Sequence, residues 1–163
     1  RDHLIEERAD ALYGSACSIA SSYSSMYQGK SSNSQLMSSE LRTLSSYLKS
    51  EIWVVDREGT IIMDSQQGLR IHTTIPDFDP TAVGNQFYTI GHYYGQFSEE
   101  VLSVSAPIVG NYNTYGYVLI HLPLSQIAQS QTSILDILYV QEFLPYLKRI
   151  HVKLHNKRLY RSK

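Results

Sequence analysis

The residues best suited to contact a small molecule stand in the middle of the chain. His92, Tyr93 and Tyr94 follow one another between two glycines, which brings an imidazole and two phenols close together. A binding pocket needs aromatic walls and a few placed polar groups, and this row can supply both. Tyr93 and Tyr94 could instead alternate inward and outward along an edge strand, in which case only one of them would face a ligand.

Charged and hydroxyl side chains extend this candidate site along the chain. Arg70 and His72 could give positive charge to a carboxylate ligand, although Arg70 could equally be solvated. Ser103 and Ser105 are two residues apart, so they share one face of a predicted strand. The candidate ligand-binding residues are therefore Arg70, His72, His92, Tyr93, Tyr94, Ser103 and Ser105.

The sequence contains no catalytic motif. Neither serine lies in a G-x-S-x-G sequence, no Gly-rich phosphate loop is present, and no base–nucleophile pair of a small hydrolase is found. We therefore expect no catalytic residue and no enzyme activity in this chain.

Metal-binding patterns are equally weak. His151 and His155 have the i, i+4 spacing of metal ligands, but no Glu stands between them and the segment is basic. Asp77 and Asp79 supply fewer oxygens than a Ca²⁺ site requires. We therefore expect no metal and no cofactor.

The charge of the 163 residues is unevenly divided. Residues 1–140 contain 7 Lys and Arg against 14 Asp and Glu, whereas residues 141–163 contain 7 Lys and Arg and one acidic residue, Glu142. Nucleic-acid-binding folds carry the basic patch on the domain itself, so this distribution argues against a nucleic-acid partner. The single cysteine, Cys17, excludes an internal disulfide, and its apolar neighbours predict a buried side chain.

Two helices are predicted before any strand. Apolar residues recur every three or four positions over residues 2–28, and Gly29 ends the pattern. This narrow stripe could pack on its own domain, on a second copy of the chain, or on both. Residues 34–49 form the second helix, whose predicted apolar face consists of Leu36, Leu41, Leu44, Tyr47 and Leu48.

A five-stranded antiparallel sheet is predicted after the helices. Residues 52–55 are apolar on both faces, which is typical of a central strand, and the turn that follows ends at Gly59, a residue free to take positive φ. The other strands are predicted at residues 60–63, 87–97, 101–109 and 115–122.

The connections around the sheet are less regular. Residues 66–90 form an insert in which Asp79 and Pro80 begin a short helix. A helical period returns over residues 124–139. No run of 18 apolar residues is present that could span a membrane.

Four stretches in this order resemble the extracytoplasmic PAS-like sensor domains, also called single Cache or PDC domains, of bacterial sensor histidine kinases. Ile52–Asp56, followed by Gly59 and Asp64-Ser65, is similar to the first hairpin of that family. Residues 76–84 are similar to its insert, residues 101–108 to its fourth strand, and residues 115–127 to its fifth strand and exit helix.

The resemblance implies an α+β sensor fold over residues 1–140. Within it, a helical stem covers residues 1–50, the sheet and insert cover residues 51–122, and an exit helix covers residues 123–140. The basic tail at 141–163 departs from the family pattern, so we expect it to lie outside the sensor fold. A ligand would bind between the sheet and the insert.

The resemblance also implies a function and partners. It predicts the signal-sensing domain of a two-component sensor histidine kinase, with the kinase in a cytoplasmic domain absent from this chain. A small molecule or a partner protein would bind, and a homodimer formed through the N-terminal helix would relay the signal. Flanking helices absent from this chain would hold the domain outside the cytoplasm of a bacterial membrane. A chemoreceptor domain and a non-membrane PAS-like interaction domain are the alternatives.

Overall fold

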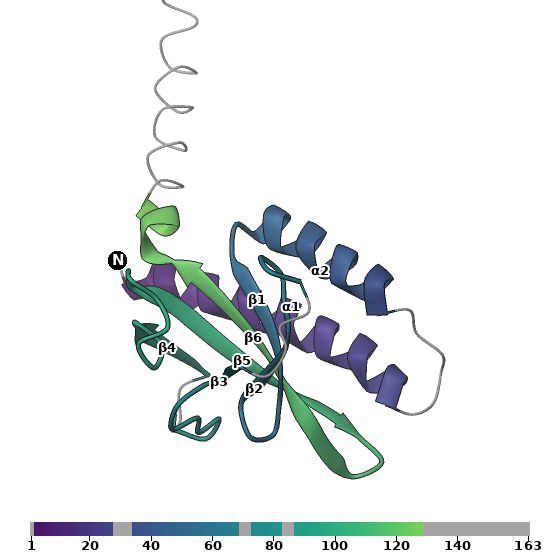
Figure 1. Cartoon of the computed structure of the whole chain (residues 1–163). Helices are drawn as coiled ribbons and strands as arrows, with labels where there is room; N and C mark the ends of the chain where they lie inside the picture. The colour runs from purple at the N-terminus through teal and green to yellow at the C-terminus, as the bar shows by residue number, and fades with distance from the viewer. Residues whose placement is uncertain (1, 28–33, 69–72, 83–86, 129–163) are drawn as a thin grey trace, which may run out of the picture. The chain divides into compact units, whose positions relative to one another are not determined.

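The computed structural model describes residues 2–27, 34–68, 73–82 and 87–128. Helices α1 (Asp2–Tyr27) and α2 (Ser34–Leu48) precede one antiparallel sheet with the strand order β3-β2-β1-β6-β5-β4 (Figure 1). The strands are β1 (Glu51–Asp56), β2 (Thr60–Asp64), β3 (Thr73–Thr74), β4 (Tyr88–Gly91), β5 (Val101–Gly110) and β6 (Asn113–Pro123). The α+β class and both predicted helices are therefore confirmed.

The sheet has six strands, one more than the sequence predicted. The additional strand, β3, has two residues, which pair with Thr60 and Ile61 at the β2 edge. A segment this short shows no period of two, so the sequence could not reveal it. At the opposite edge, β4 ends at Gly91, and the strand predicted over residues 87–97 was too long.

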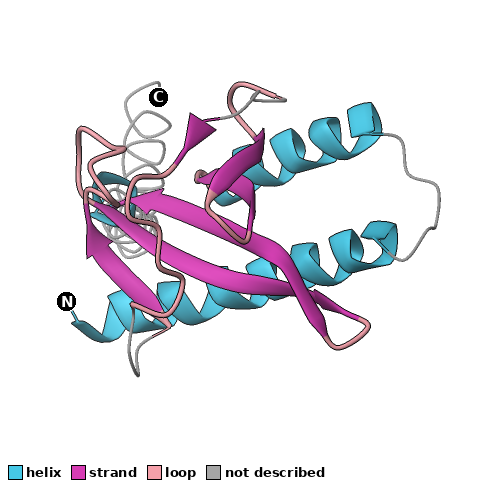
Figure 2. Cartoon of the chain, turned by 60° about the horizontal axis from the view of Figure 1, so that its bottom comes forward, coloured by secondary structure: helices cyan, strands magenta, loops and turns pink. Residues whose placement is uncertain are grey.

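The two faces of the sheet are covered by different parts of the chain. Alternation along β1 places Ile52 and Val54 on one face and Trp53 and Val55 on the other, and all four are buried. The helices lie along the first face (Figure 2). The insert covers the second face, where Trp53, Val55, Ile61, Ile75 and Leu119 form a buried cluster. Burial on both faces confirms that β1 is a central strand.

The apolar stripe of helix α1 packs against the sheet of its own domain. The helix packs on β5 and β6. The buried residues of the stripe are Ala9, Leu12, Ala16, Ile19, Ala20 and Tyr23. The Tyr23 hydroxyl donates to Met63 Sδ at 3.2 Å, and the Ser24 hydroxyl donates to the Val109 carbonyl. Cys17 is exposed, so its predicted burial was wrong. Each step along a helix rotates the side chain by about 100°, so Cys17 points away from the stripe to which Ala16 belongs.

Helix α2 buries less of its predicted apolar face. Leu41 is buried, but Leu36, Leu44 and Tyr47 are 58%, 40% and 83% exposed. These three residues share the predicted apolar face but are not covered, because α2 meets the sheet mainly beside β1. The helix ends at Leu48. The next residue, Lys49, has a φ of 51°, and the Ser50 N–H donates to the Ser45 carbonyl at 3.1 Å.

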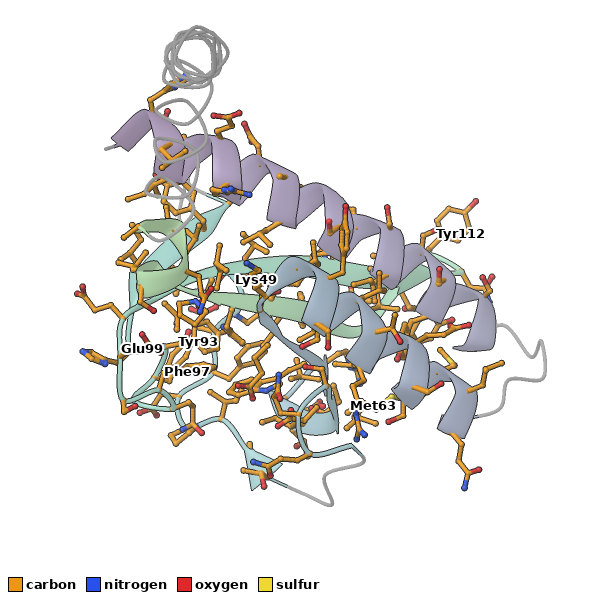
Figure 3. The ribbon with its side chains drawn as sticks, turned by 90° about the horizontal axis from the view of Figure 1, so that it is seen from above. Lys49, Met63, Tyr93, Phe97, Glu99 and Tyr112 are labelled. Atoms are coloured by element: carbon orange, nitrogen blue, oxygen red, sulfur yellow. The ribbon has the colours of Figure 1, made fainter. Side chains whose placement is uncertain are left out.

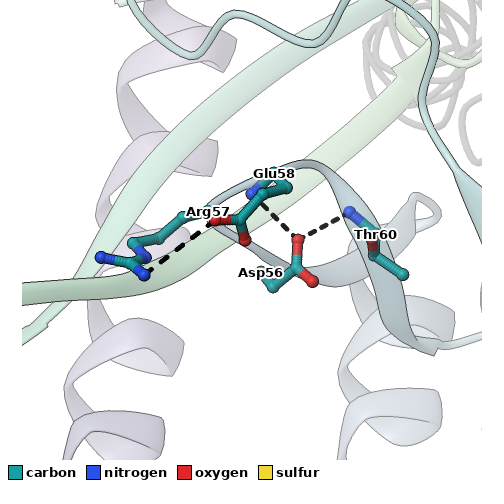
Figure 4. A network of polar contacts seen from close by, with 4 residues as sticks. All are labelled: Asp56, Arg57, Glu58 and Thr60. Carbon is teal, nitrogen blue, oxygen red and sulfur yellow. Dashed lines mark hydrogen bonds and ion pairs between the residues drawn. The ribbon is translucent and has the colours of Figure 1, made fainter.

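The β1–β2 turn has the predicted conformation. Asp56 Oδ1 accepts from the N–H groups of Glu58 and Thr60 at 3.0 and 2.8 Å (Figure 4). Gly59 has a φ of 86°, and a Cβ at this position would lie 2.5 Å from Phe78 Cβ. Glycine is therefore required both by the backbone conformation and by the packing of the insert against the turn. The exposed ion pair between Arg57 and Glu58, at 4.0 Å, adds little stability.

Residues 124–128 are helical, which agrees with the start of the predicted exit helix. The rest of that helix and the basic tail at 141–163 lie outside the described residues. Across the part of the chain that the structure describes, no helix has both the length and the apolar character needed to cross a bilayer.

Candidate ligand-binding site

A pocket of about 270 Å³ lies beside the β4 edge of the sheet, on the face that the insert covers. Strands β4 and β5 form its base, and residues 79–82 and 92–94 form its other walls. Its volume is just below the range of about 300–1,000 Å³ found for drug-sized ligands, so it suits a small compound. The described lining residues are Asp79, Pro80, Ala82, Phe87, Thr89, Ile90, Gly91, His92, Tyr93, Tyr94, Ser103, Val104 and Ser105.

The aromatic wall is held by a tight turn directly after β4. Tyr93 and Tyr94 have φ values of 40° and 53°, so neither continues the strand. Non-glycine residues in this region cost about 1–2 kcal/mol each. The turn is closed by bonds from the Gln96 N–H to the Tyr93 carbonyl and from the Phe97 N–H to the His92 carbonyl, at 3.0 and 3.2 Å. The alternative that the two tyrosines alternate along an edge strand was therefore wrong.

The two tyrosines have different environments. Tyr93 packs over the sheet, with its ring 6.3 Å from Trp53 and 4.4 Å from His121 (Figure 3). Burial, and then the neighbouring Tyr94, raise the pKa of the Tyr93 hydroxyl above its ordinary value, so this phenol stays protonated. Tyr94 is 37% exposed and packs against Phe78 at 6.4 Å. Tyr93 therefore anchors the turn, while Tyr94 remains at the surface of the pocket.

Tyr94 connects the turn to the opposite wall of the pocket. Its hydroxyl donates to the Asp79 carbonyl at 3.1 Å and accepts from the Asp79 N–H at 3.2 Å. Asp79 Oδ1 accepts from the Thr81 N–H and hydroxyl at 2.8 and 2.7 Å, and these bonds lower the pKa of the carboxyl. Asp79 therefore caps a turn, whereas the sequence predicted that it begins a short helix, and its carboxyl group is ionised near neutral pH.

A buried serine–histidine pair lies at the base. Ser103 Oγ is 2.8 Å from His121 Nδ1, and the two residues face each other across β5 and β6. The rings of Trp53, Tyr93 and Phe97 surround the imidazole at 4.5, 4.4 and 4.9 Å. Burial lowers the pKa of His121 to about 3, so the ring is neutral near neutral pH. Its Nε2 has no hydrogen-bond partner among the described residues.

The structure brings most of the predicted site residues together. His92, Tyr93, Tyr94, Ser103 and Ser105 all line the pocket. Arg70 and His72 lie outside the described residues. The role of this set in binding a ligand stays a prediction.

Sequence reasoning missed His121 and the position of Asp79 in the wall. His121 is completely buried, in a strand with neighbours on both sides. The signal was present in the alternation of β6. Leu119 and Ile120 show that both faces of this strand are apolar, so the next residue along it had to be buried as well. In the described segments, no group of three or more His, Cys, Asp or Glu could hold a metal.

Comparison with protein-family models and with curated proteins finds no match. Solved structures do match. The E. coli DcuS sensor domain is similar with a TM-score of 0.59 and 20% identity, over 80% of this chain and 98% of that domain. The sensory domain of the Campylobacter jejuni chemoreceptor Tlp3, solved with isoleucine bound, is similar with a TM-score of 0.59 and 12% identity.

The extent of these two matches differs. The match to Tlp3 covers 77% of this chain but only 56% of the Tlp3 domain, so this chain spans little more than half of that neighbour. The DcuS domain, by contrast, is matched over almost its whole length. At these identities the likeness concerns the fold, and it agrees with the helix-then-sheet order described above. The chain therefore has the PDC, or Cache-like, fold of extracytoplasmic sensor domains.

Proposed function

We propose that this chain is the signal-sensing domain of a bacterial two-component sensor histidine kinase, and that a small molecule binds in the pocket beside β4. The observation that carries the proposal is the convergence of five predicted residues, from two separate segments, on one pocket. Those residues are His92, Tyr93, Tyr94, Ser103 and Ser105. The fold adds support, because the similar solved structures are sensor domains.

The pocket is linked to the end of β6 by a short chain of contacts. The aromatic turn leads directly into Glu99 and Glu100, which precede β5. The Glu100 carbonyl accepts from the Leu124 N–H at 3.0 Å, and Glu99 Oε2 accepts from the Ser125 hydroxyl at 3.0 Å. Leu124 and Ser125 begin the helical segment that follows β6. A ligand that prefers one position of the turn would thereby shift the populations of two arrangements of this segment.

The proposal includes a homodimer formed through α1 and attachment to a membrane by segments outside this chain. The first turns of α1 and the end of β6 lie at the same end of the sheet (Figure 1, Figure 3). Both connections could then move together relative to the axis of a dimer. This arrangement would suit the relay of a signal from the pocket to a kinase in another part of the protein.

A chemoreceptor is the second candidate function. The Tlp3 sensory domain has the same TM-score as the DcuS domain, so the fold favours neither output. Addition of the ligand to membranes that contain the complete protein separates the two. A change in autophosphorylation by labelled ATP supports the kinase. Phosphorylation that requires an added separate kinase supports the chemoreceptor.

Ligand binding is tested on the chain itself. Thermal-shift screening covers small carboxylates, amines, amino acids and short peptides, and calorimetry measures the affinity of each hit. The variant Tyr94→Phe keeps the ring but loses both hydrogen bonds to Asp79, at about 1 kcal/mol each. We expect it to weaken binding about five- to tenfold.

The matched control is Tyr112→Phe, since Tyr112 is fully exposed at the tip of the β5–β6 hairpin. It should bind as tightly as the unmodified chain. Two results would contradict the proposed pocket. One is a panel without a single hit. The other is a hit that binds Tyr94→Phe and Ser103→Ala as tightly as the unmodified chain.

A further inference from the structure

The pocket lies in a part of the chain that carries negative charge only. Between residues 71 and 147 the sequence contains no Lys or Arg, so every described lining residue comes from a segment without a basic side chain other than histidine. The same stretch contains Asp77, Asp79, Glu99 and Glu100 before the end of β6. Asp79 lines the pocket itself.

The described basic residues belong to other parts of the fold. Arg8 and Arg42 are on α1 and α2, and Lys49 directly follows α2. Arg57 is in the β1–β2 turn, where it pairs with Glu58. None of these residues lines the pocket.

This distribution disfavours an anionic ligand. A carboxylate that enters a partly buried pocket loses hydration, and that loss must be compensated by a cation or by several N–H donors. Here a carboxylate would instead meet the ionised carboxylate of Asp79, whose pKa is already lowered by its bonds to Thr81. Two carboxylates that share one site repel each other.

The same pocket favours an ammonium group, because its lining offers acceptors and a negative charge. Such a group is a donor only, and the residues that line the pocket include Asp79, Thr89 and Ser105, whose carboxylate and hydroxyl oxygens are acceptors. Three aromatic residues, Phe87, Tyr93 and Tyr94, also line the pocket, and aromatic faces attract cations. The bonds from Tyr94 hold the backbone of Asp79 beside the Tyr94 ring, and the bonds from Thr81 hold the Asp79 carboxylate, before any ligand arrives.

From these observations we propose that the pocket selects a small organic cation, an alkyl- or arylalkyl-ammonium compound, with Asp79 as its counter-ion. The inference rests on the proposed function of the pocket. It adds the chemical class of the ligand and the residue that selects it. Ser103, bonded to the neutral His121 at the base, would contact the uncharged end of the ligand.

The test compares three probes of similar size on the full chain by calorimetry or NMR titration: n-pentylammonium, pentanoate and 1-pentanol. We expect the ammonium compound to bind at least about tenfold more tightly than the carboxylate, and its affinity to fall as salt rises. The variant Asp79→Asn should weaken ammonium binding about three- to tenfold and leave pentanol unchanged.

The matched control is Asp77→Asn. Asp77 stands in the same loop but does not line the pocket, and its φ of 53° suits asparagine as well as aspartate. It should leave the affinity of the ammonium probe unchanged.

Three results would overturn the inference. If pentanoate binds more tightly than the ammonium probe and Arg70→Ala abolishes that binding, the pocket remains a ligand site but its ligand is not a cation. Equal affinity of the ammonium probe for Asp79→Asn and the unmodified chain would reject Asp79 as counter-ion. No binding of the ammonium probe, with or without other hits in the thermal-shift panel, would also reject the inference. In that case the panel decides separately whether the pocket binds a small molecule at all.

Discussion

At the scale of single residues, His121 is the least expected group in the molecule. It is a titratable side chain in a fully buried position, with one hydrogen bond to Ser103 and three aromatic neighbours. A buried imidazole is tolerated only in its neutral form, because the charged form would lose its hydration without a counter-ion. Its environment therefore makes the folded state sensitive to acid.

The first prediction concerns this sensitivity. In the folded chain His121 stays neutral down to about pH 3, whereas in the unfolded chain it takes up a proton below its ordinary pKa of 6.5. The stability due to the depressed pKa is thus present above pH 6.5 and is lost as the pH falls toward 3. We expect this residue to lower the free energy of unfolding by up to about 1.4 kcal/mol per pH unit in that window.

The measurement is urea unfolding of the unmodified chain and of His121→Gln from pH 7.5 to about pH 4. Glutamine can still bond to Ser103 but does not titrate, so the variant should show a flatter pH dependence even if it is less stable at pH 7. Parallel slopes for the two proteins would show that His121 does not carry this effect.

At the scale of elements, close approach of backbones decides where side chains are tolerated. Gly116 in β6 faces Asp56 of β1, and a Cβ at this position would collide with the Val55 carbonyl. Gly14 is also a glycine in a regular element, but it lies in α1 and a Cβ there would meet no atom within 4 Å. The two positions form a matched pair.

The second prediction uses this pair. Gly116→Ala should lower the free energy of unfolding by about 1–3 kcal/mol, because the β1–β6 pairing must open to admit the methyl group. Gly14→Ala should raise it by about 0.5–1 kcal/mol, because alanine loses less conformational entropy in a helix. Chemical denaturation of both variants measures these changes. A Gly116→Ala protein as stable as the unmodified chain would contradict the β1–β6 register described here.

At the scale of the whole molecule, the position of α1 restricts how two copies could associate. The apolar stripe of α1 is used on its own sheet, so the surface left for a second copy carries short polar side chains. Ser15, Ser18, Ser22 and Ser25 lie on it, and their hydroxyls donate to the carbonyls of the preceding turn. Small side chains that satisfy their own hydrogen bonds allow two helices to approach closely.

The third prediction follows for the proposed dimer. Sedimentation equilibrium of the full chain should give a mass that rises with concentration. Ser18→Arg, on the exposed side of α1, should raise the dimer dissociation constant about tenfold or more, because it places a large charged side chain in the contact. Ser39→Arg, on the exposed side of α2, is the matched control and should leave the constant unchanged. A monomer mass at every concentration would contradict a dimer formed by this chain alone.

Much of the architecture could be predicted from the sequence because its signals are local. The period of α1, the burial of β1 on both faces and the glycine at position 59 all follow from neighbouring residues and their conformational preferences. The exposure of Leu44 and Tyr47 could not be predicted in the same way. A helical period shows which side chains share a face, but not whether the rest of the chain supplies a surface to cover it.

The candidate site shows the same difference between local sequence signals and tertiary contacts. The sequence by itself determined which chemical groups are available near β4, namely His92, Tyr93 and Tyr94, and the absence of basic residues around them. Only the tertiary structure decided that Asp79 stands opposite Tyr94 and that His121 lies under Ser103. The physical reason is that these pairs are 15 and 18 residues apart, and they meet through sheet pairing and a left-handed turn, which no local pattern encodes.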